Sequence, residues 1–263
     1  MIRSWLAHPL TRGLDLDAPE TTALWRRIIR EKEFLAEIYR EWYREISASL
    51  PVGDGAVVEL GSGAGFFDEI VSDAITSDIL RVPGIDLVAD ALELPFCSGS
   101  LRAVVMTNML HHLHEPGRLL LEAARCVRPG GVLSMIEPWV SPWSRFAYRA
   151  FHHEPFDPTA PAPRSEPGGP LSGANGALPW IIFYRDRERL SKEFPQWRLV
   201  WVHPMMPFRY VLSGGVSLRS LMPDWTFRAW TQLEHSLESA MYALAMFAHV
   251  VLRRIESPVV SER

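Results

Sequence analysis

The sequence has few cysteines, no excess of basic residues and no long apolar run. Its 263 residues include two cysteines, and 31 acidic residues outnumber 27 lysines and arginines, for a formal net charge of −4. Cys97 and Cys126 are too far apart for a paired metal knuckle and too few for a disulfide framework, so we expect a reducing, cytoplasmic setting. The acidic balance provides no attraction to phosphate backbones, so nucleic acid is not an expected partner.

No stretch reaches the roughly 20 apolar residues that span a bilayer, and the N-terminus lacks the apolar core of a signal peptide. The charge-free run Ser239–Leu252, followed by Arg253 and Arg254, is the most apolar segment near the C-terminus. Apolar residues recur there at helical spacing, which predicts an amphipathic helix. Packing on the core is the commoner role of such a helix, and peripheral membrane contact is the alternative. The sequence carries no signal for an oligomeric state.

The chain divides into three predicted parts. Apolar residues recur at helical spacing over 18–49, after residues 17–20 that have the form of a capping box, so 1–50 is predicted to be an N-terminal helical cap. Short apolar strands then alternate with helical segments, which predicts an α/β domain over 51–215. Residues 216–263 are predicted to form a C-terminal helical extension.

The α/β domain is predicted to hold a mostly parallel, seven-stranded sheet with helices on both faces. Only a turn fits between the second and third strands, so the usual crossover helix is expected to be missing. The stretch 138–183 is rich in proline, glycine and serine and too long for an ordinary connection, and its aromatic residues favour a lid over the acceptor. The predicted strands are 56–60, 74–78, 86–90, 101–107, 131–137, 198–203 and 207–212, and the predicted helices are 64–72, 116–127 and 185–194.

A glycine-rich loop follows the first strand. It reads E-L-G-S-G-A-G, with glycine at positions 61, 63 and 65. Glycines there let the backbone turn sharply and approach a ligand with no side chain between them. The spacing also matches a dinucleotide fingerprint. An NAD-dependent enzyme is therefore an alternative, although no catalytic Tyr-Lys constellation follows the loop.

Four consecutive motifs resemble those of the class I S-adenosylmethionine-dependent methyltransferases, and within them the methyltransferase type 11 group. They are VVELGSGAGFF from Val57, SDI around Asp78, DLVADALELPF from Asp86, and AVVMTNMLHHLHEPGRLLLEAARCVRPGGVL from Ala103. The resemblance covers about residues 55–137. It implies a Rossmann-like fold and S-adenosyl-L-methionine as the methyl donor, and it says nothing about the acceptor.

The resemblance also implies which residues bind the donor. Asp78 would accept hydrogen bonds from both ribose hydroxyls, which suits a carboxylate at the tip of the second strand. Asp86 is a rival for that role, because the crossover before it is unusually short. The donor-binding residues carried over from the family are Glu59, Gly61, Ser62, Gly63 and Gly65 for the amino acid end, Asp78 for the ribose, Asp90 and Ala91 for the adenine, and Asn108 and Met109 beside the donor.

Methyl transfer from a sulfonium depends on positioning and exclusion of water more than on a base. If the acceptor is a hydroxyl or an acidic carbon, His111, His153 and Glu154 are candidates to take its proton. His111 and His112 are more simply explained as packed, hydrogen-bonded histidines. No metal-ligand set is expected.

The sequence therefore predicts an S-adenosylmethionine-dependent methyltransferase that acts on oxygen or carbon of a small, apolar or amphipathic acceptor. Two alternatives stay open. One is a protein that binds the donor without turnover and has a regulatory role. The other is a peripheral membrane methyltransferase of a lipid or quinone precursor.

Overall fold

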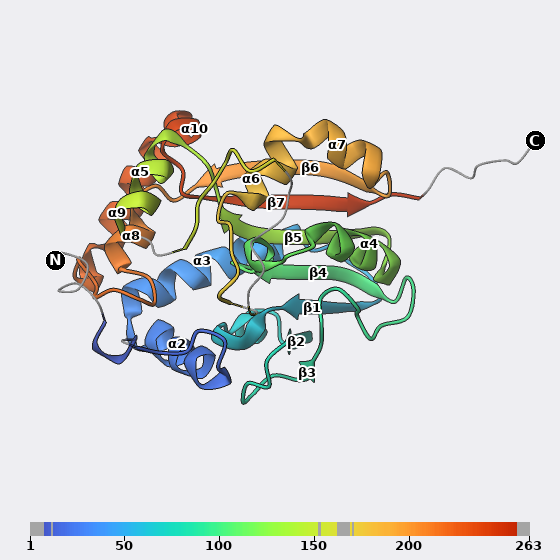
Figure 1. Ribbon diagram of the computed structural model, residues 1–263, viewed down its shortest axis with the longest axis horizontal. Coiled ribbons are helices and arrows are strands. Elements are labelled where there is room, and N and C mark those ends of the chain that lie inside the picture. The colour runs from blue at the N-terminus through green and yellow to red at the C-terminus, as the bar shows by residue number, and fades with distance from the viewer. Residues whose placement is uncertain (1–7, 12, 152–153, 162–168, 170, 257–263) are drawn as a thin grey trace, which may run out of the picture.

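A computed structural model describes residues 8–11, 13–151, 154–161, 169 and 171–256. Its centre is a seven-stranded sheet in the order β3-β2-β1-β4-β5-β7-β6, in which β7 alone runs antiparallel to its neighbours (Figure 1). The predicted Rossmann-like architecture with a mostly parallel sheet is confirmed. The strands are β1 Ala56–Leu60, β2 Ala74–Asp78, β3 Leu87–Val88, β4 Leu101–Thr107, β5 Val127–Pro138, β6 Trp197–Met205 and β7 Phe247–Arg254.

Each face of the sheet is covered by its own apolar cluster. Successive residues of a strand point to opposite faces, and accordingly Val57 belongs to the cluster with α3 (Glu33–Ser49) and Val58 to the cluster with α4 (Pro116–Cys126) and α7 (Arg187–Glu193). Both valines are fully buried. These two layers of helix hold the sheet rigid, so the loops at its edge have fixed starting points.

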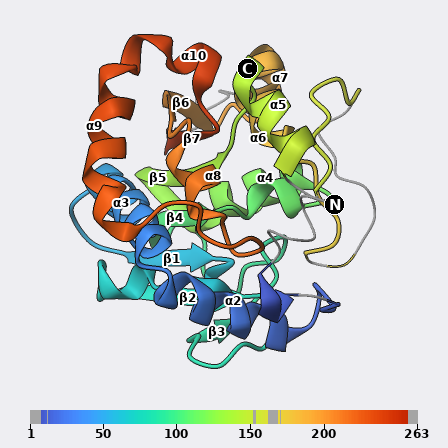
Figure 2. The same cartoon turned by 90° about the vertical axis from the view of Figure 1, so that its left-hand side faces the viewer.

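The remaining helices gather at one end of the sheet, where β1, β4 and β5 end (Figures 1 and 2). They are α2 Pro19–Glu31, α5 Pro142–Phe151, α8 Arg209–Ser213, α9 Phe227–Ser236 and α10 Met241–Leu244, while α6 Leu178–Trp180 lies in the insertion. One-turn 3₁₀ helices occur at Pro9–Thr11, Ser62–Ala64, Phe67–Glu69, Leu110–His112, Asp224–Thr226 and Glu238–Ala240, and a π-helical turn at Ile181–Arg185. This crowded end forms walls around the carboxyl ends of the parallel strands.

The single N-terminal helix predicted over 18–49 was wrong, because the chain breaks at Lys32 between α2 and α3. The Lys32 ammonium donates hydrogen bonds to two carbonyl oxygens of the loop after α8, those of Gly215 and Leu218. The predicted capping box was also wrong. The Asp17 carboxylate accepts the N–H groups of residues 171 and 172 of the insertion instead of capping α2.

The helix predicted at 64–72 was wrong as well, since two 3₁₀ turns take its place. Gly65 adopts an extended conformation that interrupts the helix, and the N–H of Phe66 donates to the Tyr43 hydroxyl on α3. The missing crossover helix between β2 and β3 is confirmed. The segment 79–86 is an irregular turn, closed by hydrogen bonds between Asp86 and Thr76.

The C-terminal prediction needs the largest correction. The predicted strand 207–212 is mostly α8, and the last predicted helix ends in β7, which lies between β5 and β6. Residues 247–252 are all buried. A strand buried on both faces is a continuous apolar run, which periodicity alone cannot distinguish from a helix. The prediction of a helix over residues 247–254 was therefore wrong, because this segment is a strand of the sheet. Among the described residues no helix has the length and apolarity to cross a membrane.

Candidate active site

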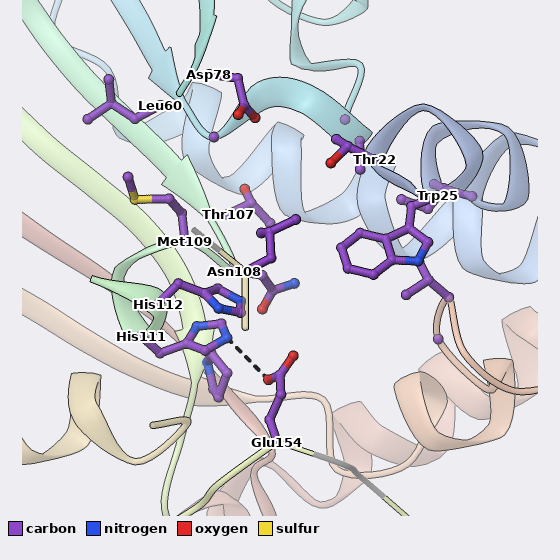
Figure 3. Close-up of a pocket in the computed structure, with 18 of the residues that line it drawn as sticks. Thr22, Trp25, Leu60, Asp78, Thr107, Asn108, Met109, His111, His112 and Glu154 are labelled. Atoms are coloured by element: carbon purple, nitrogen blue, oxygen red, sulfur yellow. Dashed lines mark ion pairs between the residues drawn. The ribbon is translucent and has the colours of Figure 1, made fainter. Parts of the chain in front are cut away.

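A cavity of about 520 Å³ lies at the carboxyl ends of β1, β2 and β4. The chain leaves β1 toward β2 on one side, while β4 lies on the other side of β1. Open α/β sheets bind their ligands at such a switch point. Figure 3 shows Asp78 at one side of this cavity and Glu154 at the other, with Asn108 and His111 between them.

The glycine loop fits tightly against the tip of β2. Gly61 has a φ of +70°, in the left-handed region that favours glycine. The N–H of Gly63 donates to Asp78 Oδ2 over 3.0 Å. A Cβ added at Gly63 would lie 2.6 Å from that same oxygen, and one at Gly61 would lie 2.8 Å from Met109 Cγ. Glycine is therefore required here by the close approach of neighbouring groups.

Three polar atoms in the cavity wall are buried and have no hydrogen-bond partner among the described residues. They are Glu59 Oε2, Thr22 Oγ1 and Thr107 Oγ1. Leaving a buried polar group unpaired costs roughly 1–3 kcal/mol, and such groups commonly mark a functional site. Burial raises the pKa of Glu59 to about 8, and the nearby acids Asp68 and Asp78 act in the same direction. A cationic ligand beside Glu59 would satisfy both its charge and its unpaired oxygen.

Asp78 lines the cavity and Asp86 does not. Asp78 is held in place by the N–H groups of Gly63 and Leu80. The Asp86 carboxylate is bound to Thr76, accepting from its N–H over 2.9 Å and from its hydroxyl over 2.8 Å. Of the two acids weighed for the ribose contact, Asp78 alone faces the cavity.

The other predicted donor residues divide into two groups. Glu59, Gly61, Gly65, Asp90, Ala91, Asn108 and Met109 line the cavity. Ser62 and Gly63 lie behind it, and the Ser62 hydroxyl ties β1 to β2 by donating to the carbonyl of Glu59 and accepting the N–H of Ser77. Asn108 has a φ of +54°, a strained conformation that turns the chain sharply at the end of β4.

A buried carboxylate, Glu137 at the end of β5, organises the turn after β4. Its Oε1 accepts the N–H groups of Met109 and Leu110, at 2.8 and 2.7 Å, and its Oε2 lies 2.7 Å from His111 Nδ1. On the other side of the ring, His111 Nε2 lies 3.5 Å from Glu154 Oε2. Burial lowers the pKa of His111, but the two carboxylates outweigh it and raise the value to about 9. The sequence analysis missed Glu137, because a lone acid at a strand end has no distinctive pattern.

His112 stacks beside His111, with ring centroids 4.2 Å apart. Its Nδ1 lies 3.3 Å from the carbonyl oxygen of Gly173 in the insertion. Burial, together with the charge of His111, lowers the pKa of His112 to about 4. The third catalytic candidate from the sequence, His153, lies outside the described residues.

The cavity also has apolar walls that are rich in aromatic side chains. These walls are formed by α2, α3, α5, α8, the loop after α8 and the start of β7. Sequence reasoning missed these residues, although Tyr39 and Tyr43 are spaced to share one face of a helix. They include Trp25, Ile29, Tyr39, Tyr43, Tyr148, Tyr210, Val211, Val216, Leu218, Met246 and Phe247.

The insertion is attached to the protein by its aromatic residues. Tyr148 of α5 stacks on Phe156 at 4.3 Å between ring centroids, and the Trp143 indole donates to the carbonyl of Pro207. The N–H of Asn175 donates to the carbonyl of His111 over 2.9 Å. Closure of this segment over an acceptor stays a prediction.

The fold and site define a class of protein: a Rossmann-like domain with a donor-sized cavity at the glycine loop. Residues 58–135 match the family model described as a methyltransferase domain. Residues 58–135 are therefore a methyltransferase domain, in agreement with the resemblance noted from the sequence.

Two curated relatives are demethylmenaquinone methyltransferases. The protein from Renibacterium salmoninarum is 31% identical over 113 residues, covering 37% of this chain and 48% of its own length. The protein from Paenarthrobacter aurescens is 32% identical over 113 residues, covering 37% and 45%. The chain thus spans about half the length of the curated relatives that it matches.

Solved structures with the same fold cover more of the chain. A methyltransferase in complex with the Haloferax volcanii Trm112 methyltransferase activator superposes with a TM-score of 0.54, at 14% identity, over 92% of this chain and 98% of its own. A methyltransferase of Thermotoga maritima gives 0.53 at 16% identity, over 88% and 98%. At these identities the likeness establishes the fold.

Proposed function

We propose that the protein transfers a methyl group from S-adenosylmethionine to a small, mainly apolar acceptor. The observation that carries this proposal is the buried, unpaired Glu59 oxygen in a cavity whose other half is aromatic. When bound, the donor supplies a methyl group on a sulfonium, which is an excellent leaving group. The residues of the chain therefore have to bind and orient the donor and the acceptor, and to exclude water from them.

The donor half of the cavity has a suitable group for each part of the donor. Glu59 would hold the ammonium, Asp78 the vicinal ribose hydroxyls, and Asp90 with the N–H of Ala91 the adenine edge. The glycine loop presents backbone without side chains to the amino acid end. Asn108 and Met109 would flank the sulfonium side, since they stand where β4 ends beside β1.

The acceptor half has apolar walls and one polar cluster. The aromatic side chains in these walls offer large, rigid contact surfaces to a flat apolar ring. His111 and Glu154 lie on the wall of the same cavity, where an acidic hydroxyl or carbon of the acceptor would meet them. An amphipathic acceptor methylated on oxygen or carbon follows from this combination, and a compound of the demethylmenaquinone type is the first to test.

The test begins with calorimetry of the full chain against S-adenosylmethionine, its demethylated product and NAD. We expect both sulfur compounds to bind once per chain and NAD not to bind. Labelled donor is then offered with a panel of quinol, phenol and polar acceptors of similar size. Failure to bind the donor product would disprove the proposal, and transfer only to the polar acceptors would disprove its acceptor half.

A matched pair of variants connects this binding to Glu59. Glu59→Gln keeps the side-chain size and removes the charge that would face the ammonium, so donor affinity should fall at least ~10-fold. Glu69→Gln removes an acid that is paired with Arg30 at the surface and does not line the cavity, and affinity should stay within about 2-fold of the wild-type value. Equal affinity in both variants would place the ammonium elsewhere.

A further inference from the structure

Three side chains with metal-ligand atoms meet at one wall of the cavity. His111 and His112 follow β4, and Glu154 comes from the insertion (Figure 3). One ligand atom from each lies within 4.8 Å of the other two. His111 Nε2 and Glu154 Oε2 are 3.5 Å apart, and two ligands each roughly 2.1 Å from a tetrahedral ion are about 3.4 Å apart. That pair already has the required separation, and a modest movement of the third side chain completes the set.

The hydrogen bonds at Nδ1 orient both imidazole rings. The acceptor beside His111 Nδ1 is the Glu137 carboxylate, whose other oxygen binds two backbone N–H groups. The acceptor beside His112 Nδ1 is the Gly173 carbonyl. A carbonyl can only accept, so Nδ1 of His112 carries the hydrogen and Nε2 carries the lone pair. Metal-binding histidines are typically fixed in this way, with the non-ligating ring nitrogen donating to a carboxylate or a carbonyl.

The charges also favour a cation at this point. Glu137 is fully buried and Glu154 is mostly buried, so two carboxylates stand on opposite sides of the His111 ring. Coulomb attraction to a cation is stronger here than at the surface, because little water screens it. Glu137 Oε1 and Oε2 both face groups of the turn after β4, whereas Glu154 places a carboxylate oxygen within 4.8 Å of a ring nitrogen of His111 and of His112.

We propose that His111, His112 and Glu154 bind one divalent transition metal ion. Two imidazole nitrogens and one carboxylate oxygen suit Zn²⁺, Fe²⁺, Co²⁺ or Mn²⁺, whereas Mg²⁺ and Ca²⁺ prefer oxygen ligands alone. Three protein ligands leave at least one coordination position toward the cavity. If the proposed methyl transfer is correct, on which this last step rests, an acidic oxygen of the acceptor would take that position and be polarised by the ion.

The experiment uses untagged full-length protein, stripped with a chelator and dialysed against Zn²⁺ in parallel with a protein-free chamber. Mass spectrometry of the metal should find one Zn²⁺ per chain, and Co²⁺ should give visible absorption bands of a site with mixed nitrogen and oxygen ligands. The variants His112→Ala and Glu154→Gln each remove one ligand. Both should weaken Zn²⁺ binding at least ~10-fold, while circular dichroism shows an intact fold.

Two control variants remove a histidine outside the cluster. His114→Ala alters a residue that also lines the cavity, and His235→Ala alters an exposed residue on α9. Both should retain one Zn²⁺ per chain. Absence of Zn²⁺ from the wild-type protein, or equal retention in His112→Ala and Glu154→Gln, would overturn the metal site. Binding of the donor product, measured by calorimetry in the same samples, separates that failure from failure of the proposed function.

Discussion

The backbone N–H of Gly63 and the carboxylate of Asp78 are joined by a 3.0 Å hydrogen bond that fixes the glycine loop to the tip of β2. We predict that Gly63→Ala lowers donor affinity at least ~10-fold, because the new Cβ would lie 2.5 Å from Thr22 Cγ2 and 2.6 Å from Asp78 Oδ2, and both cavity-lining side chains would have to shift. Calorimetry with the donor product measures the loss. Gly117→Ala at the start of α4 is the control, since its Cβ meets only the end of the Phe194 ring at 3.2 Å and should leave affinity unchanged.

The two acids of the β2–β3 region should respond differently to removal. Asp78→Ala should weaken donor binding about 10–100-fold, the loss expected for charge-assisted hydrogen bonds to two hydroxyls. Asp86→Ala should leave binding within about 2-fold and cost about 1 kcal/mol of stability, since its partner is Thr76. The opposite outcome in calorimetry would transfer the ribose contact to Asp86.

Glu59 should make the ligand-free protein less stable as the pH rises. Its pKa is about 8 in the folded state, against 4.5 in the unfolded chain. Between these values the folded protein holds a proton that the unfolded chain has released, so stability is lost from pH 4.5 upward until about pH 8, by at most about 1.4 kcal/mol per pH unit. Denaturant titrations of wild type and Glu59→Gln at several pH values isolate this contribution.

The same denaturant titrations test whether the donor product binds beside Glu59. Saturating donor product places an ammonium beside Glu59, which favours the charged carboxylate and should flatten the pH dependence of the wild-type protein. Groups common to both proteins cancel in the difference between wild type and Glu59→Gln. They include Arg26, Tyr39, Tyr43, Asp68 and Asp78 around the carboxylate. Identical slopes for the two proteins would show that Glu59 is ionised throughout.

Glu137 should stabilise the folded protein as well as position the His111 ring. Glu137→Ala leaves two backbone N–H groups and the His111 ring without their buried acceptor, which should cost about 3–5 kcal/mol in urea unfolding. Glu115→Ala removes an acid whose partner, Arg118, is exposed, and should change stability by less than about 0.5 kcal/mol. A small loss for Glu137→Ala would mean that the turn after β4 is held by other contacts.

The local parts of the fold and of the donor half were predictable from the sequence. β1 and β2 have the predicted bounds, and so does β4, because each is a short apolar run closed by a turn signal. The cavity is lined by most of the residues carried over from the family, since the loops at strand ends keep their order along the chain. The sequence alone could not decide whether Asp78 or Asp86 faces the cavity, because the answer depends on the conformation of the turn between β2 and β3.

The acceptor half could not be predicted in this way. Its walls come from α2, α3, α5, α8 and β7, which are far apart in the sequence and meet only through tertiary packing. The sequence around Trp25 and Tyr210 does not indicate whether these side chains line a cavity or pack in the core. Likewise the cluster around His111 depends on Glu137 and Glu154, each contributed by a different segment.

The position of β7 sets the order in which the protein can fold during synthesis. Residues 247–254 pair with β5 and with β6, and Val251 is paired with Ser134, which lies more than a hundred residues earlier in the chain, and with Trp201. A ribosome must release all of this segment before β5 has its second neighbour and β6 has any neighbour. Such distant pairing is slow, and until it occurs the apolar edges of β5 and β6 are exposed to other nascent chains. We therefore expect the sheet to be completed only after residues 247–254 have left the ribosome, and the earlier strands to need protection from aggregation until then.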